Sequence, residues 1–260
     1  MSFIIYKLIK MEQPQVNKIA SITLLFWLLK IVATTLGETL GDYISMTLNL
    51  GYLAGIAITS VLFIAFLYHQ VHSQKYQPIS FWLVIIATTT LGTEISDFID
   101  RSLHLGYTIG SLLLFVGLAI TLLIWHRKYK NIEVVTITES NKEILFWVAV
   151  LFSNSLGTAF GDYLSDVVGF SYLQGALVTA SIILIVVALH YFTKINQVFL
   201  FWLAFVFTRP FGATFGDFLT KPIAKGGLDL GTLQSSIISL LLMSLLLYFE
   251  HKKLESIKIQ

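Results

Sequence analysis

The chain is 260 residues long, 56% hydrophobic and only 12% charged, with a mean hydropathy of +0.79. Soluble domains carry roughly 25% charged residues, so this composition excludes a water-soluble fold and indicates a multi-pass membrane protein. The net charge of +2 gives no reason to expect a nucleic-acid partner, and the sequence has no cysteine for a disulfide or a thiolate metal site.

The first stretch, residues 1–19, mixes apolar residues with Lys7 and Lys10 and lacks a small-residue cleavage site. This pattern does not fit a signal peptide and is typical of a short helix lying on the membrane surface. We therefore expect residues 1–19 to form a cytoplasmic or interfacial segment rather than a spanning helix.

A unit that is repeated four times fills most of the remaining chain. Each copy carries a Phe-Trp pair, then a glycine ten residues after the tryptophan and an aspartate fifteen residues after it. Identical spacing in four copies indicates internal duplication. The pairs, glycines and aspartates are Phe26-Trp27, Gly37 and Asp42; Phe81-Trp82, Gly92 and Asp97; Phe146-Trp147, Gly157 and Asp162; and Phe201-Trp202, Gly212 and Asp217.

Each unit contains two apolar segments of roughly 20 residues, the length that a spanning helix requires. The sequence therefore predicts an all-α membrane protein with eight spans, four in a first repeat pair (residues 20–130) and four in a second (residues 144–250). A cytoplasmic linker (131–143) and a cytoplasmic tail (251–260) complete this division. Because two spans return the chain to its starting side, all units enter the membrane in the same direction, and their pseudo-symmetry axis should follow the membrane normal.

Lysine and arginine are distributed unequally between the two sides of the predicted spans. Twelve lie in the termini and inter-unit linkers, whereas three lie in the turns inside the units: Arg101, Lys221 and Lys225. The positive-inside rule then places both termini in the cytoplasm. The Phe-Trp pairs fall at the inner interface, where an aromatic belt is expected, and Lys30 is expected to extend to the same interface.

One face of the first helix in every unit is polar. At 100° per residue, the first unit places Thr34, Glu38, Gly41, Asp42 and Ser45 within an arc of about 100°. Four such faces around one axis predict a polar interior. The same positions hold Thr89, Thr93, Ser96, Asp97 and Asp100 in the second unit, Asn154, Thr158, Gly161, Asp162 and Ser165 in the third, and Arg209, Ala213, Gly216, Asp217 and Thr220 in the fourth.

Small residues recur four apart on these helices, as at Gly37 and Gly41. Small-xxx-small patterns let helices approach closely in membranes. We expect this close packing to bring the polar faces together.

Burying this many acids in a membrane is costly. An ionised aspartate at the bilayer centre costs roughly 2.5–3.5 kcal/mol, so four would cost on the order of 10–14 kcal/mol, comparable to the net stability of a domain. The acids must therefore be hydrogen-bonded, protonated or paired with cations. Only Lys30 and Arg209 are expected as fixed positive partners within the helices, which leaves a bound cation or a proton as the complement for the other acids.

The sequence therefore predicts a central cation site. Carboxylate and amide oxygens suit hard or borderline cations such as Mg²⁺, Ca²⁺ and Mn²⁺. The alternative is that the acids only cap helix ends or bond to neighbouring units. The expected metal ligands are Asp42, Asp97, Asp162 and Asp217, with Glu38, Glu94, Asn154 and Asp100 contributing to the site and Arg209 balancing charge.

The four Phe-Trp…Gly-x-x-x-(Gly/Ser)-Asp units resemble a bacterial membrane-protein family built from tandem repeats of unknown function, with two spans and a characteristic Trp in each repeat. The resemblance covers residues 20–250 and implies an eight-span bacterial inner-membrane protein without implying an activity. In its chemistry, Glu38-Thr-Leu-Gly41-Asp42 is also similar to the Glu-x-Gly-Asp motif of Ca²⁺/Mn²⁺ cation/proton exchangers. This chain has one additional residue between Glu38 and Gly41, and Tyr43 stands where those exchangers carry a base.

The leading hypothesis is a secondary transporter that exports a divalent cation in exchange for protons, with no cofactor and with membrane lipid, cation and protons as its partners. A pseudo-fourfold cation channel and a membrane scaffold or sensor are the alternatives. An enzyme is not expected, because the sequence shows no nucleophile with a histidine partner, no His-rich metal motif and no Gly-rich phosphate loop. Assembly into a homo-oligomer is left open.

Overall fold

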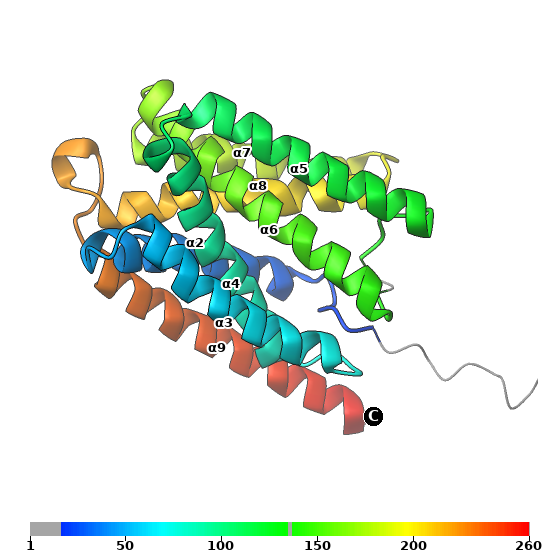
Figure 1. Cartoon of the computed structure of the whole chain (residues 1–260). Coiled ribbons are helices and arrows are strands. Elements are labelled where there is room, and N and C mark those ends of the chain that lie inside the picture. The colour runs from blue at the N-terminus through cyan, green and yellow to red at the C-terminus, as the bar shows by residue number, and fades with distance from the viewer. Residues whose placement is uncertain (1–16, 135–136, 260) are drawn as a thin grey trace, which may run out of the picture.

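A computed structural model describes residues 17–134 and 137–259, except for the side chains of residues 257–259. Within this part of the chain, eight helices are long and apolar enough to cross a membrane, and they lie in one bundle (Figure 1). The all-α fold with two spans per repeat is therefore confirmed. Most of the predicted N-terminal segment, residues 1–16, lies outside the described residues. The helices are α2 Leu24–Asp42, α3 Tyr52–His72, α4 Pro78–Asp97, α5 Gly106–Tyr129, α6 Ser140–Asp162, α7 Tyr172–Phe192, α8 Gln197–Thr220 and α9 Thr232–Ile259.

Local sequence explains where the helices begin. The Thr23 hydroxyl accepts a hydrogen bond from the Phe26 amide at the start of α2, and the Asn196 side chain accepts bonds from two amides at the start of α8. Pro78 opens α4, where the first turn offers no intrahelical partner for an amide hydrogen in any case. Gly51 precedes α3 with a φ of 77°, a conformation that favours glycine.

The first helices of the four units form an inner ring. Helix α2 packs against α4, α4 against α6, α6 against α8, and α8 against α2. In each ring helix, 56–78% of the most apolar window is buried inside the protein, whereas the second helices of the units bury only 11–28%. The second helices therefore form an outer layer whose apolar side chains face the lipid.

Each outer helix packs mainly on the ring helix of the following unit. Helix α3 lies on α4, α5 on α6, α7 on α8, and α9 returns to lie on α2. The last unit thus closes onto the first, as expected for parallel repeats arranged around one axis. The chain must fold all four units together, because each outer helix finds its main partner in a neighbouring unit.

The contacts between ring helices follow the repeat. A Cβ added at Gly92 would lie 3.1 Å from the Cβ of Asn154, and one added at Gly37 would collide with Thr89. The prediction that small residues permit close packing is therefore confirmed. The repeated glycine of each ring helix meets the first stripe residue of the next: Gly37 meets Thr89, Gly92 meets Asn154, Gly157 meets Arg209 and Gly212 meets Thr34.

The Phe-Trp pairs build an aromatic core across the ring. Phe81, Trp82, Phe146 and Trp147 are completely buried, and the ring centroids of Phe81 and Trp147 lie 5.3 Å apart. The expectation of an aromatic belt facing the interface is therefore wrong for most of these residues. They lie on the buried face of the ring helices, where aromatic rings pack against one another.

Two connecting segments cover the same end of the ring. Ile19, from the segment before α2, and Val134 and Ile137, from the linker after α5, are buried against the aromatic core. The Lys18 amide donates to the Ile137 carbonyl at 3.0 Å, which joins the two segments. This end of the ring is therefore closed by apolar side chains together with a buried ion pair, in which Lys18 Nζ lies 2.6 Å from Glu143 Oε2.

Candidate functional site

The four repeated aspartates lie in the last turns of the ring helices, toward the end opposite the aromatic core. Asp42, Asp97 and Asp162 are the final residues of α2, α4 and α6, and a π-helical turn follows each of them: η1 Tyr43–Thr47, η2 Phe98–Ser102 and η3 Tyr163–Val167. π-helical turns occur frequently at functional sites. Helix α8 instead carries Asp217 one turn before its end, and all four residues are at most 5% exposed.

Two basic side chains join these aspartates across unit boundaries. Both bases lie four residues after an aspartate, so each reaches back to its own helix and across to the next one. Arg101 Nε lies 3.4 Å from Asp97 Oδ1 and its Nη2 lies 3.1 Å from Asp162 Oδ2, whereas Lys221 Nζ lies 3.2 Å from Asp217 Oδ1 and 2.6 Å from Asp42 Oδ2.

The expectation that only Lys30 and Arg209 pair with buried acids is therefore wrong. The sequence analysis assigns Arg101 and Lys221 to the turns inside the units and not to the helices that carry the acids. The π-helical turn after α4 and the full length of α8 carry the two bases into the cluster instead. Their spacing from Asp97 and Asp217 is the signal that could have revealed this role.

Lys221 lies just beyond the last residue of α8 and is held in its charged form by its partners. Burial lowers the pKa of Lys221, but the carboxylates of Asp217 and Asp42 together raise it by more, so the net shift is upward. The ammonium group therefore remains a cation over the whole physiological pH range.

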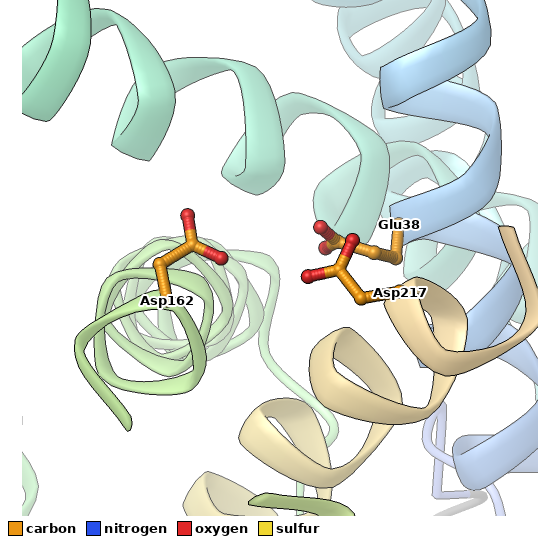
Figure 2. Close-up of side chains that lie close together, drawn as sticks. All are labelled: Glu38, Asp162 and Asp217. Carbon is orange, nitrogen blue, oxygen red and sulfur yellow. The ribbon is translucent and has the colours of Figure 1, made fainter. Parts of the chain in front are cut away.

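Three carboxylates come close enough to share one ion. Ligand oxygens of Glu38, Asp162 and Asp217 all lie within 4.8 Å of one another, and all three residues are buried. Figure 2 shows the carboxylates of Glu38 and Asp217 side by side, with Asp162 facing them from α6. An ion equidistant from three oxygens that lie at most 4.8 Å apart would be about 2.8 Å or less from each, so a small inward movement of the side chains would reach the 2.3–2.6 Å of Ca²⁺–oxygen bonds.

Arg209 lies next to this acidic triad, on the side that faces the aromatic core. Its Nη2 lies 2.8 Å from Glu38 Oε2, and it also donates to the Thr93 hydroxyl on the opposite ring helix α4. The guanidinium is completely buried and crosses the ring from α8. Arg209 therefore balances the charge of Glu38, as the sequence predicts for an acid of the cluster.

Lys30 crosses the ring at a second level, between Arg209 and the aromatic core. Its Nζ donates to Asn154 Oδ1 at 3.0 Å on the diagonally opposite helix α6 and lies 4.2 Å from the centroid of the Phe205 ring. Lys30 is completely buried, so the expectation that it extends to the interface is wrong. Asn154 is occupied by Lys30 and Thr88 and does not join the triad.

Two further candidate residues face outward from the ring. Glu94 Oε2 lies 2.5 Å from the Thr59 hydroxyl of α3. Asp100 packs against Gly110 of α5, and its Oδ2 accepts a bond of 3.4 Å from Ser96. The geometry therefore separates both acids from the triad, even though they share a helix with Asp97.

The ion-pair network fixes the charge of the cluster. Within the described residues it joins five carboxylates to three basic side chains, so the fully ionised cluster carries two uncompensated negative charges. One divalent cation or two protons would neutralise it. The carboxylates are Glu38, Asp42, Asp97, Asp162 and Asp217, and the bases are Arg101, Arg209 and Lys221.

Comparison with known proteins identifies the repeat. The family model described as Repeat of Unknown Function (DUF347) matches four times, over residues 25–76, 80–131, 145–196 and 200–253. Each match covers one ring helix and the outer helix that follows it. No curated protein and no solved structure matches the chain. The four matches cover most of the sequence, and the chain therefore belongs to the DUF347 family of membrane proteins.

Proposed function

We propose that the chain is a secondary transporter that exchanges a divalent cation of the Mn²⁺, Ca²⁺ or Mg²⁺ class for protons. Glu38, Asp162 and Asp217 hold the cation in this proposal, and Asp42 and Asp97 complete the surrounding charge. The proposed substrate is the ion itself, so no cofactor takes part.

The observation that carries the proposal is the charge of the buried cluster. Two uncompensated negative charges in a membrane-buried site are unfavourable unless a ligand neutralises them. A divalent cation and two protons bring the same charge, so either state leaves the cluster neutral. Exchange of one divalent cation for two protons would couple the movement of the metal ion to that of the protons, and the buried cluster would stay neutral in both states.

The path along the ring axis supports a transporter over a continuously open channel. Arg209 and Lys30 cross the ring at successive levels, and the aromatic core closes the end beyond them. A cation moving straight through would meet the positive charge of Arg209, then the Lys30 side chain, and then the closely packed aromatic core. Movement from the triad to the other side therefore requires a second conformation, which is how alternating access operates.

We also propose the orientation and location of the protein. The excess of Lys and Arg in the termini and inter-unit linkers favours a bacterial inner membrane with both termini in the cytoplasm. The aspartate cluster would then open toward the periplasm, and export would require release on that side. Reporter fusions at Lys75, Lys194 and the C-terminus should all report a cytoplasmic location, and one periplasmic signal would reverse the assignment.

The test is flux into liposomes that contain the purified full-length protein, with a metal-sensitive dye and a pH-sensitive dye inside. A Mn²⁺ gradient should drive metal movement together with proton movement in the opposite direction. Asp162→Asn should abolish both signals. Asp229→Asn is the matched control, because Asp229 is an exposed acid in the loop after α8 and its φ of 56° is one that asparagine tolerates.

Each alternative function has its own outcome in this assay. Metal flux with an ionic current and no coupled proton movement would identify a channel. Absence of flux for Mn²⁺, Ca²⁺ and Mg²⁺ in protein that retains its helices would overturn transport of these ions and favour the scaffold hypothesis.

A further inference from the structure

The residue four positions after each repeated aspartate differs in charge from unit to unit. These positions hold Met46, Arg101, Asp166 and Lys221. Arg101 and Lys221 each join the ring helix of their own unit to that of the next unit, and the repeat places Met46 and Asp166 at equivalent positions. The four junctions of the ring therefore differ in the charge of this side chain, in addition to the differences among the polar-face residues.

A base fills two of these junctions. Arg101 bridges Asp97 and Asp162 at the α4–α6 junction. At the α8–α2 junction, Lys221 makes the equivalent bridge between two aspartates. The ammonium and guanidinium groups occupy the place that a bound cation would take between two carboxylates from neighbouring units.

The α6–α8 junction has an acid at the same position. Asp166 is exposed, and its Oδ2 accepts a bond of 2.6 Å from the Tyr107 hydroxyl. This junction lies between Asp162 and Asp217, the two aspartates of the triad, and Glu38 adds a third carboxylate. The diagonally opposite α2–α4 junction carries Met46, which brings neither charge nor a hard ligand.

Asp217 belongs to two junctions. Its Oδ1 lies 3.2 Å from Lys221 Nζ at the α8–α2 junction, and its carboxylate also lies in the triad with Glu38 and Asp162 at the α6–α8 junction. Among the described residues, no single basic side chain forms an ion pair with both Asp162 and Asp217, whereas Arg101 and Lys221 each join two aspartates at their own junctions.

We propose that the fourth residue after each aspartate determines which junction of the ring binds a cation. Arg101 and Lys221 occupy their junctions as tethered cations, and Asp166 leaves the α6–α8 junction open and draws a divalent cation from the outer surface toward Glu38, Asp162 and Asp217. This inference rests on the proposed function and adds to it a single binding junction and the side chain that controls access to it.

The test measures Mn²⁺ binding to purified full-length protein by the loss of the electron paramagnetic resonance signal of free Mn²⁺. Asp166→Lys gives the α6–α8 junction the residue that Lys221 supplies at the α8–α2 junction, so the tethered amine should compete with the ion. We expect its affinity to fall on the order of tenfold or more, equivalent to about 1.4 kcal/mol or more. Met46→Lys is the matched control, since it adds a base at the same level of the diagonally opposite junction and should weaken binding by roughly threefold at most.

A second variant keeps the test valid if Asp166→Lys does not fold, as judged by circular dichroism and gel filtration. Asp166→Asn removes only the charge at the surface and should weaken binding less than Asp166→Lys but more than Met46→Lys.

The outcomes separate this inference from the proposed function. Failure of the wild-type protein to bind Mn²⁺, Ca²⁺ or Mg²⁺ would overturn the cation site itself. Wild-type binding that Asp166→Lys and Met46→Lys weaken equally would leave the cation site in place and refute the control by Asp166.

Discussion

Replacing one partner of the Glu38–Arg209 pair should have very different consequences from replacing the other. Glu38→Gln leaves a completely buried guanidinium without its carboxylate, and arginine cannot lose its charge in a protein. Arg209→Met leaves a carboxylate that still accepts a hydrogen bond from Thr93 and can take up a proton or a metal ion. We therefore expect Glu38→Gln to be the more destabilising variant.

The magnitude follows from the geometry of the pair. At a separation of 2.8 Å and an effective dielectric constant of about 20, the attraction is about 6 kcal/mol before desolvation is considered. Breaking a buried ion pair by removing one partner costs about 3–5 kcal/mol. Arg209 retains the carbonyl oxygens of Thr34 and Thr89 at 3.4 and 3.5 Å, so Glu38→Gln should cost about 3 kcal/mol, at the lower end of that range.

The assay is reversible unfolding in mixed micelles, followed by tryptophan fluorescence because the aromatic core reports on the ring directly. Arg209→Met should cost about 1–3 kcal/mol, because the Glu38 carboxylate then keeps only its hydrogen bond from Thr93. It should also bind Mn²⁺ more tightly than wild type, because the cluster then carries three uncompensated charges. The double variant Glu38→Gln, Arg209→Met should recover part of the stability that Glu38→Gln loses.

Two results would refute this reasoning. Glu38→Gln within about 0.5 kcal/mol of wild type would show that the guanidinium does not depend on Glu38. A larger stability loss in Arg209→Met than in Glu38→Gln would show that packing of the long arginine side chain, rather than its charge, dominates the pair.

Three further predictions address the helix contacts and the other buried bases. Gly37→Ala should destabilise the protein by about 1–3 kcal/mol, because the added methyl group collides with Thr89, whereas Ala57→Leu on the exposed face of α3 should have little effect in the same unfolding assay. Lys30→Met should leave stability equal or higher, since it removes a buried amine that has no carboxylate partner among the described residues, and a loss above about 2 kcal/mol would contradict this. Folding raises the pKa of Lys221, so the stability difference between wild type and Lys221→Met should remain constant from pH 7 to about pH 10. The difference should shrink only as the pH rises toward the elevated pKa of the folded state. A decline between pH 7 and 9 would contradict the ion pairs assigned to Lys221.

Repetition and composition were sufficient to predict the architecture. Spacing that recurs four times fixes which positions are equivalent, and equivalent positions on parallel repeats must lie around one axis. The glycines could be interpreted because a small residue has one main structural role at this spacing in a membrane helix. The pairing of each outer helix with the following unit could not be predicted, because it depends on the angle at which the two helices of a unit diverge.

The candidate site was predicted less completely, for reasons that concern the ends of the helices. A periodic pattern locates Glu38 and the four aspartates, but it does not reveal that a π-helical turn extends beyond Asp97 and carries Arg101 into the cluster. Glu94 and Asp100 lie close to the polar face in a helical projection, yet their side chains face α3 and α5. A few tens of degrees of helix rotation decide such cases, and sequence periodicity does not resolve rotation that finely.

The distribution of charge within the ring shows how a repeated scaffold becomes a specific site. A ring with four identical acidic units would repel itself strongly, because each added carboxylate lies near the others in a medium of low dielectric constant. Arg101 and Lys221 remove most of that repulsion at two opposite junctions, and Arg209 removes more beneath the triad. The charge that remains is concentrated where Glu38 joins Asp162 and Asp217, the only group of carboxylates in the described residues that meets the geometry for a shared ion. In this arrangement the aspartates common to all units supply carboxylate ligands, and the residues that differ between units determine at which junction a cation can bind to them.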